Sequence, residues 1–209
     1  IIASAGEIDM TKYKSKFNNI GLGTRVITGA QIQRYYITDT PSQGNVIYIN
    51  DQNKPGLSSK REQEVSNPRI VLQRITGVDS KVRIISTLIN GHMYCANSTN
   101  YIANDNSINI KYLLGVLNSS LVNFFIKQTS TNTNITAKVL NSIPIIFPST
   151  KMQEAIIRIV DYVLIIKSLP SDIIIDQYVD NDVMARQFEN VIDALIYEFI
   201  SVPLKLGRS

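Results

Sequence analysis

Short strand-like segments fill the first half of the chain. Runs rich in Ile, Val and Tyr between turn residues are typical of β-strands. Such runs occupy residues 21–29, 31–38, 45–50, 67–77, 81–90 and 91–103. The run at 67–77 carries apolar side chains at both alternations, so we expect both faces of that strand to be covered. Asn90-Gly91 predicts a hairpin between the last two runs, and the polar segment 51–64 predicts a loop leading into a short helix.

Helical spacing replaces this pattern from Asn109 onward. Residues 109–128 repeat apolar side chains at helical spacing, and Asn109 suits the N-cap. Two further amphipathic helices are expected at 150–167, after a cap at Ser149 or Thr150 and before the stop at Pro170, and at 181–200. The apolar face predicted for the last helix comprises Phe188, Val191, Ile192, Leu195 and Phe199.

This order of elements predicts an α+β fold in two parts. We expect a domain with a mixed β-sheet at residues 1–148 and a C-terminal pair of helices, a helical extension, at residues 149–209. A hydrophobic fraction of 44% is enough for a sizeable core. No apolar run is long enough to span a membrane. The chain starts without Met and without a signal-peptide pattern, which indicates a piece of a longer polypeptide.

Catalytic chemistry is sparse in this sequence. Cys95 is the only cysteine and His92 the only histidine, which excludes an internal disulfide and a four-ligand zinc site. A single cysteine fits a reducing, cytoplasmic setting. A Cys–His nucleophile pair stays open as an alternative to an inert core cysteine. Neither a Walker phosphate loop nor a Gly-x-Ser-x-Gly elbow is present, and the Asp176–Asp182 segment lacks the glycine and glutamate of a calcium loop.

Charge divides the chain unevenly. Residues 1–150 carry fifteen Lys and Arg against eight Asp and Glu, whereas residues 151–209 carry six against nine. This balance favours an anionic partner for the first part, with ordinary surface solubility as the alternative. Arg, Gln, Asn and Thr suit base edges, and Lys and Arg suit phosphates. The candidate DNA contacts are Arg34, Tyr35, Arg69, Gln73, Arg74, Thr76, Lys81, Arg83, Lys127, Gln128, Thr129, Ser130, Thr131, Asn132, Asn134 and Lys138.

A run of uncharged hydrogen-bonding side chains, Gln128–Asn134, follows the predicted helix at 109–128. One interpretation is a solvated connector. The other is a surface that forms hydrogen bonds with a partner without the indiscriminate attraction that lysines would add.

The order of several segments resembles a known family. "RVITGAQIQRYYI", "VIYIN", "NPRIVLQRITG", "YLLGVLNSSLVNFFIKQTS" and "LNSIPI" together resemble the TaqI-like C-terminal specificity domain, over about residues 20–148. The "GVLNSSLVNFF" helix and the "IPI" segment are the most specific parts. The C-terminal "FENVIDALIYEF" is similar to the helical end of the same enzymes.

The resemblance implies a target-recognition domain of an adenine-specific DNA methyltransferase in a restriction–modification system, with a fused nuclease left open. Such a domain reads double-stranded DNA opposite a methyltransferase domain of the same polypeptide, which binds S-adenosylmethionine and flips the target adenine. The catalytic motif Asn-Pro-Pro-Tyr/Phe is absent, because "SNPRI" at 66–70 has one proline followed by arginine. We therefore expect DNA recognition without methylation by this chain. Asn118 and Ser119 are typical of the family and are expected to pack helices.

Two alternatives remain at this stage. One is a protein-interaction module whose C-terminal helices dock a partner subunit. The other is a stand-alone enzyme built on His92 and Cys95.

Overall fold

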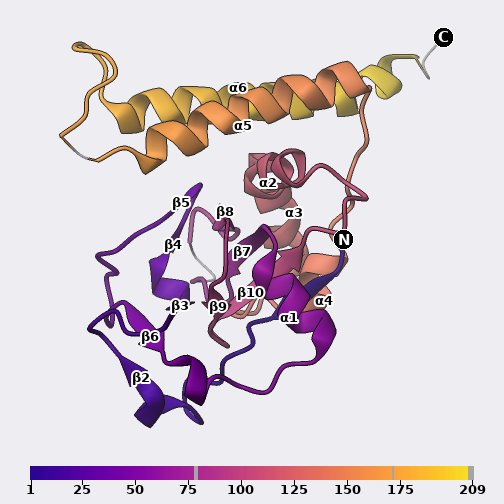
Figure 1. Cartoon of the computed structure of the whole chain (residues 1–209). Coiled ribbons are helices and arrows are strands. Elements are labelled where there is room, and N and C mark those ends of the chain that lie inside the picture. The colour runs from indigo at the N-terminus through magenta and orange to yellow at the C-terminus, as the bar shows by residue number, and fades with distance from the viewer. Residues whose placement is uncertain (78–79, 171, 207–209) are drawn as a thin grey trace.

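The computed structural model describes residues 1–77, 80–170 and 172–206 (Figure 1). An antiparallel four-stranded sheet has the order β1-β10-β7-β8, built from Ala3–Ala5, Thr99–Ala103, Arg69–Gln73 and Ser86–Ile89. A second sheet has the order β2-β6-β3-β9, built from Phe17–Asn18, Ile47–Ile49, Thr24–Ile27 and Tyr94–Cys95. Its β3 and β9 are parallel, whereas its other pairs are antiparallel. The mixed sheet predicted from the sequence is therefore confirmed.

The α-helices are α1 Ser59–Ser66, α2 Ile110–Asn118, α3 Ser120–Thr129, α4 Ala137–Asn141, α5 Thr150–Ser168 and α6 Asn181–Leu206. Helices α2, α5 and α6 cover one side of the first sheet, whereas α1 contacts other cores. In Figure 1, α5 and α6 run side by side, and α2 lies between this pair and the strands. The α+β class and the two C-terminal helices are confirmed, as is the short helix, which begins at Ser59 within the polar segment 51–64.

Strand β7 is covered on both faces, as its sequence predicts. Ile70 and Leu72 point into the largest core, which also contains side chains of α2, α5 and α6. Val71, between them, packs in another core with Cys95 and Tyr101. Alternate residues of one strand thus pack in two different cores, which explains why the centre of β7, Ile70–Leu72, is apolar without alternation.

The hairpin predicted at Asn90-Gly91 is wrong. Gly91 does turn the chain, with φ of +86°. However, β8 pairs with β7, whereas β9 leaves that sheet and pairs in parallel with β3. A local turn signal specifies the change in direction but does not specify which distant strand each arm will join.

The run at 31–38 is also not one strand. It forms β4 (Ile32–Gln33) and β5 (Tyr36–Ile37), an antiparallel hairpin that turns at Arg34 and Tyr35. Tyr35 has φ of +68°, and its backbone N–H donates to the carbonyl oxygen of Ser86 at 3.0 Å. Its ring is buried in the largest core, and this packing offsets the cost of an unfavourable backbone conformation.

The helix predicted at 109–128 is two helices. Asn109 caps α2 as expected, because its side chain accepts bonds from the N–H groups of Lys111 and Tyr112. Ser119 then leaves the helical conformation, with ψ of 154°, and its hydroxyl accepts the N–H of Val122 at the start of α3. The apolar spacing around Ser119 is the same whether this serine caps a second helix or lies within one continuous helix. The sequence pattern therefore did not predict the break.

The C-terminal helices share the main core with the strands. Ile156 and Val160 of α5 pack on Gly115 of α2, and Ala185, Ile192 and Ile196 of α6 are buried. Val191, placed on the apolar face from sequence, is 46% exposed. The division between residues 1–148 and 149–209 stays a prediction, and residues 207–209 lie outside the described residues.

Candidate nucleic-acid interface

Several predicted contact residues lie in the interior. The side chains of Tyr35, Arg69, Thr76, Arg83 and Ser130 are all buried. Burial raises the pKa of the Tyr35 hydroxyl well above its ordinary value, so the hydroxyl stays neutral. A buried side chain cannot reach a duplex in this conformation, so the structure gives these residues a supporting role instead.

Arg69 joins the two four-stranded sheets. Its guanidinium forms a fully buried ion pair with Glu7 and donates to the carbonyl oxygen of Met93 at 2.5 Å. It also lies 4.6 Å from the centre of the Tyr101 ring. The other carboxylate oxygen of Glu7 accepts the N–H of Cys95 at 2.7 Å. The charge is therefore used inside the fold and is not presented to a partner.

Arg83 holds the polar run Gln128–Asn134 in place. Its guanidinium donates to the hydroxyl of Thr76 at 3.2 Å and to the carbonyl oxygen of Ser130 at 3.3 Å. A third bond reaches the carbonyl oxygen of Asn132. The run is thus anchored through its backbone, which leaves its side chains out of these contacts.

The polar run pairs with the chain after β7. Ile75 and Asn134 form an antiparallel bridge, and the N–H of Thr76 donates to the carbonyl oxygen of Thr133 at 3.1 Å. The N–H of Ile135 donates to the carbonyl oxygen of Arg74 at 2.7 Å. The exposed side chains of the polar run are Gln128, Thr129, Thr131, Asn132, Thr133 and Asn134. The run is an ordered edge that presents neutral donors and acceptors, which agrees better with a recognition surface than with a loose connector.

Next to this edge lies a groove of about 660 Å³, called here the neutral groove. Its polar lining residues come from the segment after β3, from β4, from the β5–β6 connection, from the end of β7 and from the turn before β10. They are Thr28, Gln33, Ser42, Gln43, Asn45, Gln73 and Ser98, and Ile75 on its rim is 62% exposed. Among its described lining residues there is no Lys, Arg, Asp or Glu. Ligand binding in this groove would depend on hydrogen-bond geometry.

A second open cleft of about 660 Å³, called here the basic cleft, lies between the strands and α6. Its cationic lining residues are Arg34, Lys81, Lys127, Lys167 and Arg186, and its carboxylates are Asp182, Glu189 and Asp193. Gln33 lines both the basic cleft and the neutral groove, so the two are contiguous. Three predicted contacts, Arg34, Lys81 and Lys127, meet here although they are far apart in the sequence.

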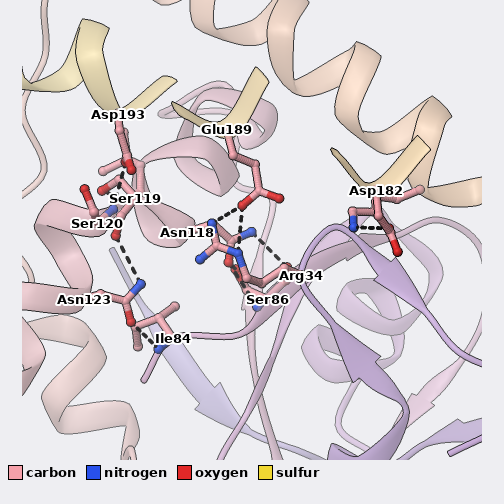
Figure 2. Close-up of polar contacts among 12 residues, drawn as sticks. Arg34, Ile84, Ser86, Asn118, Ser119, Ser120, Asn123, Asp182, Glu189 and Asp193 are labelled. Carbon is pink, nitrogen blue, oxygen red and sulfur yellow. Dashed lines mark hydrogen bonds and ion pairs between the residues drawn. The ribbon is translucent and has the colours of Figure 1, made fainter. Parts of the chain in front are cut away.

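The carboxylates of α6 are already engaged (Figure 2). Glu189 accepts from Nε of Arg34 at 2.9 Å, and Asp193 accepts the backbone N–H of Ser120 at 2.8 Å. Asp182 pairs with Lys167 at 2.6 Å. Among the described residues, no carboxylate pairs with Lys81, Lys127 or Arg186, all of which are exposed. Those three cations remain available to phosphates.

Asn118 and Asn123 stabilise the wall of the basic cleft through hydrogen bonds. The carboxamide of Asn118 is fully buried and exchanges hydrogen bonds with both the backbone and the hydroxyl of Ser86. The carboxamide oxygen of Asn123 accepts the N–H groups of Arg83 and Ile84 at 2.7 and 3.0 Å (Figure 2). These side chains therefore connect the helices to the strands. This agrees with the packing role expected of Asn118, whereas Ser119 caps α3.

Besides the buried residues and the polar run, two further predicted contacts lie outside both hollows. Arg74 is half-buried and donates to the carbonyl oxygen of Asn97 at 3.1 Å. Lys138 is exposed on α4 and is not a lining residue of either hollow. Sequence analysis missed Gln33, Gln43, Asn45 and Arg186, because their spacing along the chain carries no signal and only the fold brings them together.

The enzyme built on His92 and Cys95 finds no support. Cys95 is fully buried, and burial raises the pKa of its thiol to about 12, which suppresses the reactive thiolate. His92 is exposed and lies edge-on to Tyr94. Within the described residues no group of three or more metal-ligating side chains occurs, and no helix is long and apolar enough to cross a membrane.

The sequence profile of the TaqI-like C-terminal specificity domain matches residues 24–145, which is more than half of the chain. The chain belongs to this family. It is thus a DNA target-recognition domain of the kind found in restriction–modification systems. Among curated proteins, none matches the sequence of this specificity domain.

Two solved structures with TM-scores above 0.5 share the fold of this specificity domain. The Type IIL restriction-modification enzyme MmeI, solved in complex with DNA, is 13% identical, with a TM-score of 0.57 over 95% of this chain and 31% of that chain. A structure of the assembly and conformational transition of the type I R-M system is 16% identical, with a TM-score of 0.52 over 94% and 42%. The HsdS subunit from Thermoanaerobacter tengcongensis is also 16% identical, with a TM-score of 0.49 over 94% and 42%. The specificity domain spans less than half of each of these chains.

Proposed function

We propose that this specificity domain recognises a defined sequence in double-stranded DNA on behalf of an adenine-N6 DNA methyltransferase. The observation that carries the proposal is the junction of two unlike surfaces at Gln33. On one side lie exposed cations, and on the other lies a groove with a neutral polar lining. A DNA-reading surface needs both kinds of contact, because contacts to phosphates hold any duplex whereas hydrogen bonds to base edges distinguish its sequence.

The two surfaces would divide the work of binding. Lys81, Lys127 and Arg186 would hold the DNA backbone, and the affinity they supply would fall steeply as salt displaces them from the phosphates. The neutral groove and the edge formed by the polar run would then contact base edges. Ion pairs already satisfy Arg34 and Lys167, so these two residues would keep α6 in place.

Methylation would require a further domain. The chain carries no Asn-Pro-Pro-Tyr/Phe motif, so a methyltransferase domain of the same polypeptide would supply both catalysis and the S-adenosylmethionine site. S-adenosylmethionine would donate the methyl group there, and this chain would position the DNA. A cytoplasmic location is part of the proposal, and the single free cysteine fits it.

A binding measurement tests DNA recognition directly. Fluorescence anisotropy with random-sequence and genomic duplexes, at about 50 and 200 mM salt, should show binding that weakens by at least roughly tenfold over this range. Binding that is absent at the lower salt concentration, or that is independent of salt, would overturn the proposal.

The adenine methyltransferase part has its own test. The polypeptide that carries this chain is expressed in a host without adenine methylation, and the DNA of the host is sequenced for N6-methyladenine. We expect modification at one short motif. Unmodified DNA from a host that produces the folded protein would contradict the methyltransferase assignment and leave DNA recognition standing.

A second candidate is a subunit-docking module. The turn between α5 and α6 exposes Ile173, Ile174, Ile175 and Tyr178, the last at 85%. Exposed apolar clusters of this kind are typical of protein contacts. Salt-insensitive behaviour and failure to bind DNA, together with co-purification of a partner subunit that is lost on Ile174→Ser substitution, would favour this candidate.

A further inference from the structure

The neutral groove contains an unusual concentration of carboxamides. Gln33, Gln43, Asn45 and Gln73 all line it, from three separate segments of the chain. Charged residues make up 18% of the chain, yet none of the described lining residues is charged. A surface that only had to attract a phosphate backbone would carry cations, so the groove is suited to a different part of the ligand.

Hydrogen bonds within the fold give the floor of this groove a defined shape. The Nε2 of Gln73 donates to the carbonyl oxygen of Ile32 at 2.7 Å, which ties the end of β7 to β4. A carboxamide has two N–H donors and an oxygen acceptor, so this single bond uses only part of its capacity. The hydroxyl of Ser98 accepts the N–H of Gly29 at 3.1 Å and fixes the adjacent wall. Side chains oriented in advance lose less entropy when they bind.

Carboxamides have a preferred base partner. The side chain of Gln or Asn can form two hydrogen bonds with adenine. Its amide N–H donates to N7, and its amide oxygen accepts from the N6 amino group. The methyl group of thymine, in the same base pair, favours an apolar contact. Ile75, which is 62% exposed on the rim, supplies such a surface beside the glutamines.

The basic cleft identifies the ligand as nucleic acid. Carboxamides also bond to peptide backbones, but the exposed Lys81 and Lys127 in the adjoining cleft suit the regularly spaced phosphates of a duplex. Gln33 lines both hollows, so a duplex whose backbone lies on these lysines would bring base edges toward the groove. We infer that the neutral groove reads A·T base pairs from the major-groove side, through the carboxamides of Gln33 and Asn45 supported by Gln73. This inference rests on the DNA recognition proposed above.

The test is selection of duplexes from a randomised library by the 209-residue chain. The wild-type chain is compared with Gln33→Ala and Asn45→Ala. Gln177→Ala serves as a matched control, because Gln177 is exposed in the α5–α6 turn away from the groove. We expect wild-type sites with A·T pairs at fixed positions, and a loss of roughly tenfold to 100-fold in preference at one such position in each groove variant. The control should select the wild-type sites.

A second variant makes the test independent of lost stability. Gln33→Glu replaces the amide with a carboxylate, which accepts from N4 of cytosine. We expect the preference at the position relaxed by Gln33→Ala to move from A·T toward C·G. Wild-type sites without fixed A·T pairs, or groove variants that select the wild-type sites, would overturn the inference while DNA recognition stands. If the wild-type chain binds no DNA at all, the proposed function itself fails.

Discussion

At the scale of single residues, four of the predicted cationic contacts show two opposite extremes of burial. Arg69 and Arg83 are fully buried and bond to groups inside the fold, whereas Lys81 and Lys127 are exposed beside a cleft. Removing a charge from water is costly unless partners replace the lost hydration, so the buried arginines need their partners. The exposed lysines keep their hydration until a ligand displaces it, and they can exchange water for phosphate.

Loss of the carboxylate of Glu7 should destabilise the fold. Glu7→Gln leaves the buried guanidinium of Arg69 without its counter-charge, at an expected cost of about 3 kcal/mol in the free energy of unfolding. Urea denaturation measures this change. Asp39→Asn is the matched control, because its carboxylate is 77% exposed and pairs with Arg25 at the surface, where a change below about 1 kcal/mol is expected. Equal effects of the two substitutions would contradict the structural role of Arg69.

Lys127 should contribute to affinity without contributing to sequence preference. Lys127→Ala is expected to weaken binding to all duplexes alike and to lower the salt slope by about 1, since one phosphate contact is lost. Lys151→Ala, which removes an equally exposed charge at the start of α5, is the control. Anisotropy titrations over a salt series give both slopes. A changed site preference for Lys127→Ala would show that this residue contacts bases.

The thiol of Cys95 should make the fold sensitive to high pH. Its pKa is raised by burial from 9.0 to about 12, so the thiol ionises first in the unfolded chain. This residue stabilises the fold fully below pH 9, and its contribution is lost as the pH rises from 9 toward 12. Chemical denaturation at several pH values should show a shallower fall for Cys95→Ala. Rapid alkylation of the native thiol at pH 8 would contradict its burial.

At the scale of elements, the contact between α2 and α5 depends on a residue without a side chain. A Cβ on Gly115 of α2 would lie 3.0 Å from methyl groups of Ile156 and Val160 on α5. Both methyl groups belong to buried β-branched side chains, which have little freedom to move away. The glycine therefore sets how closely the C-terminal helices approach the rest of the molecule.

Gly115→Ala should separate α2 from α5. Overpacking is expected to exceed the gain in helix propensity, which leaves a net loss of about 1–2 kcal/mol in the free energy of unfolding. Gly56→Ala is the control, because a Cβ there meets no atom within 4 Å among the described residues. Thermal unfolding measures both variants. A Gly115→Ala protein as stable as the wild type would show that the contact can relax.

At the scale of the whole molecule, the strands and the C-terminal helices share one core. Ile70 and Leu72 of β7 belong to the same cluster as Ile156 of α5 and Ile192 of α6. Charge adds to this packing, because Arg34 of the basic first part pairs with Glu189 of the acidic tail. The basic cleft itself lies between these two parts, so the proposed recognition surface depends on their docking.

A fragment of residues 1–148 should fail to fold stably. Without α5 and α6, the apolar side chains of α2 would be exposed to water, and the loss of burial would exceed the small net stability of a typical domain. Urea denaturation and near-ultraviolet circular dichroism of the fragment test this expectation. Cooperative unfolding with the stability of the 209-residue chain would instead support the independent domain expected from the sequence.

Local patterns predicted those features that depend on neighbours along the chain. The apolar run of β7 indicated a strand covered on both faces, and Asn109 was correctly placed as a helix cap. The break at Ser119 and the turn at Tyr35 were missed, because buried contacts with Val116, Ser86 and the largest core stabilise them. The contacts that stabilise the turn at Tyr35 lie far along the chain, and the bond that stabilises the break at Ser119 lies within a pattern typical of one continuous helix.

The candidate interface shows the same division. The sequence by itself determined the composition of the proposed recognition surface, namely a basic first part and a neutral polar run, because charge and hydrogen-bonding capacity belong to each residue. Only the tertiary structure decided which groups are exposed. It buried Arg69 and Arg83, exposed Lys81 and Lys127, and assembled Gln33, Asn45 and Gln73 into one groove. The physical reason is that desolvation and packing depend on contacts between segments that no local pattern of residues specifies.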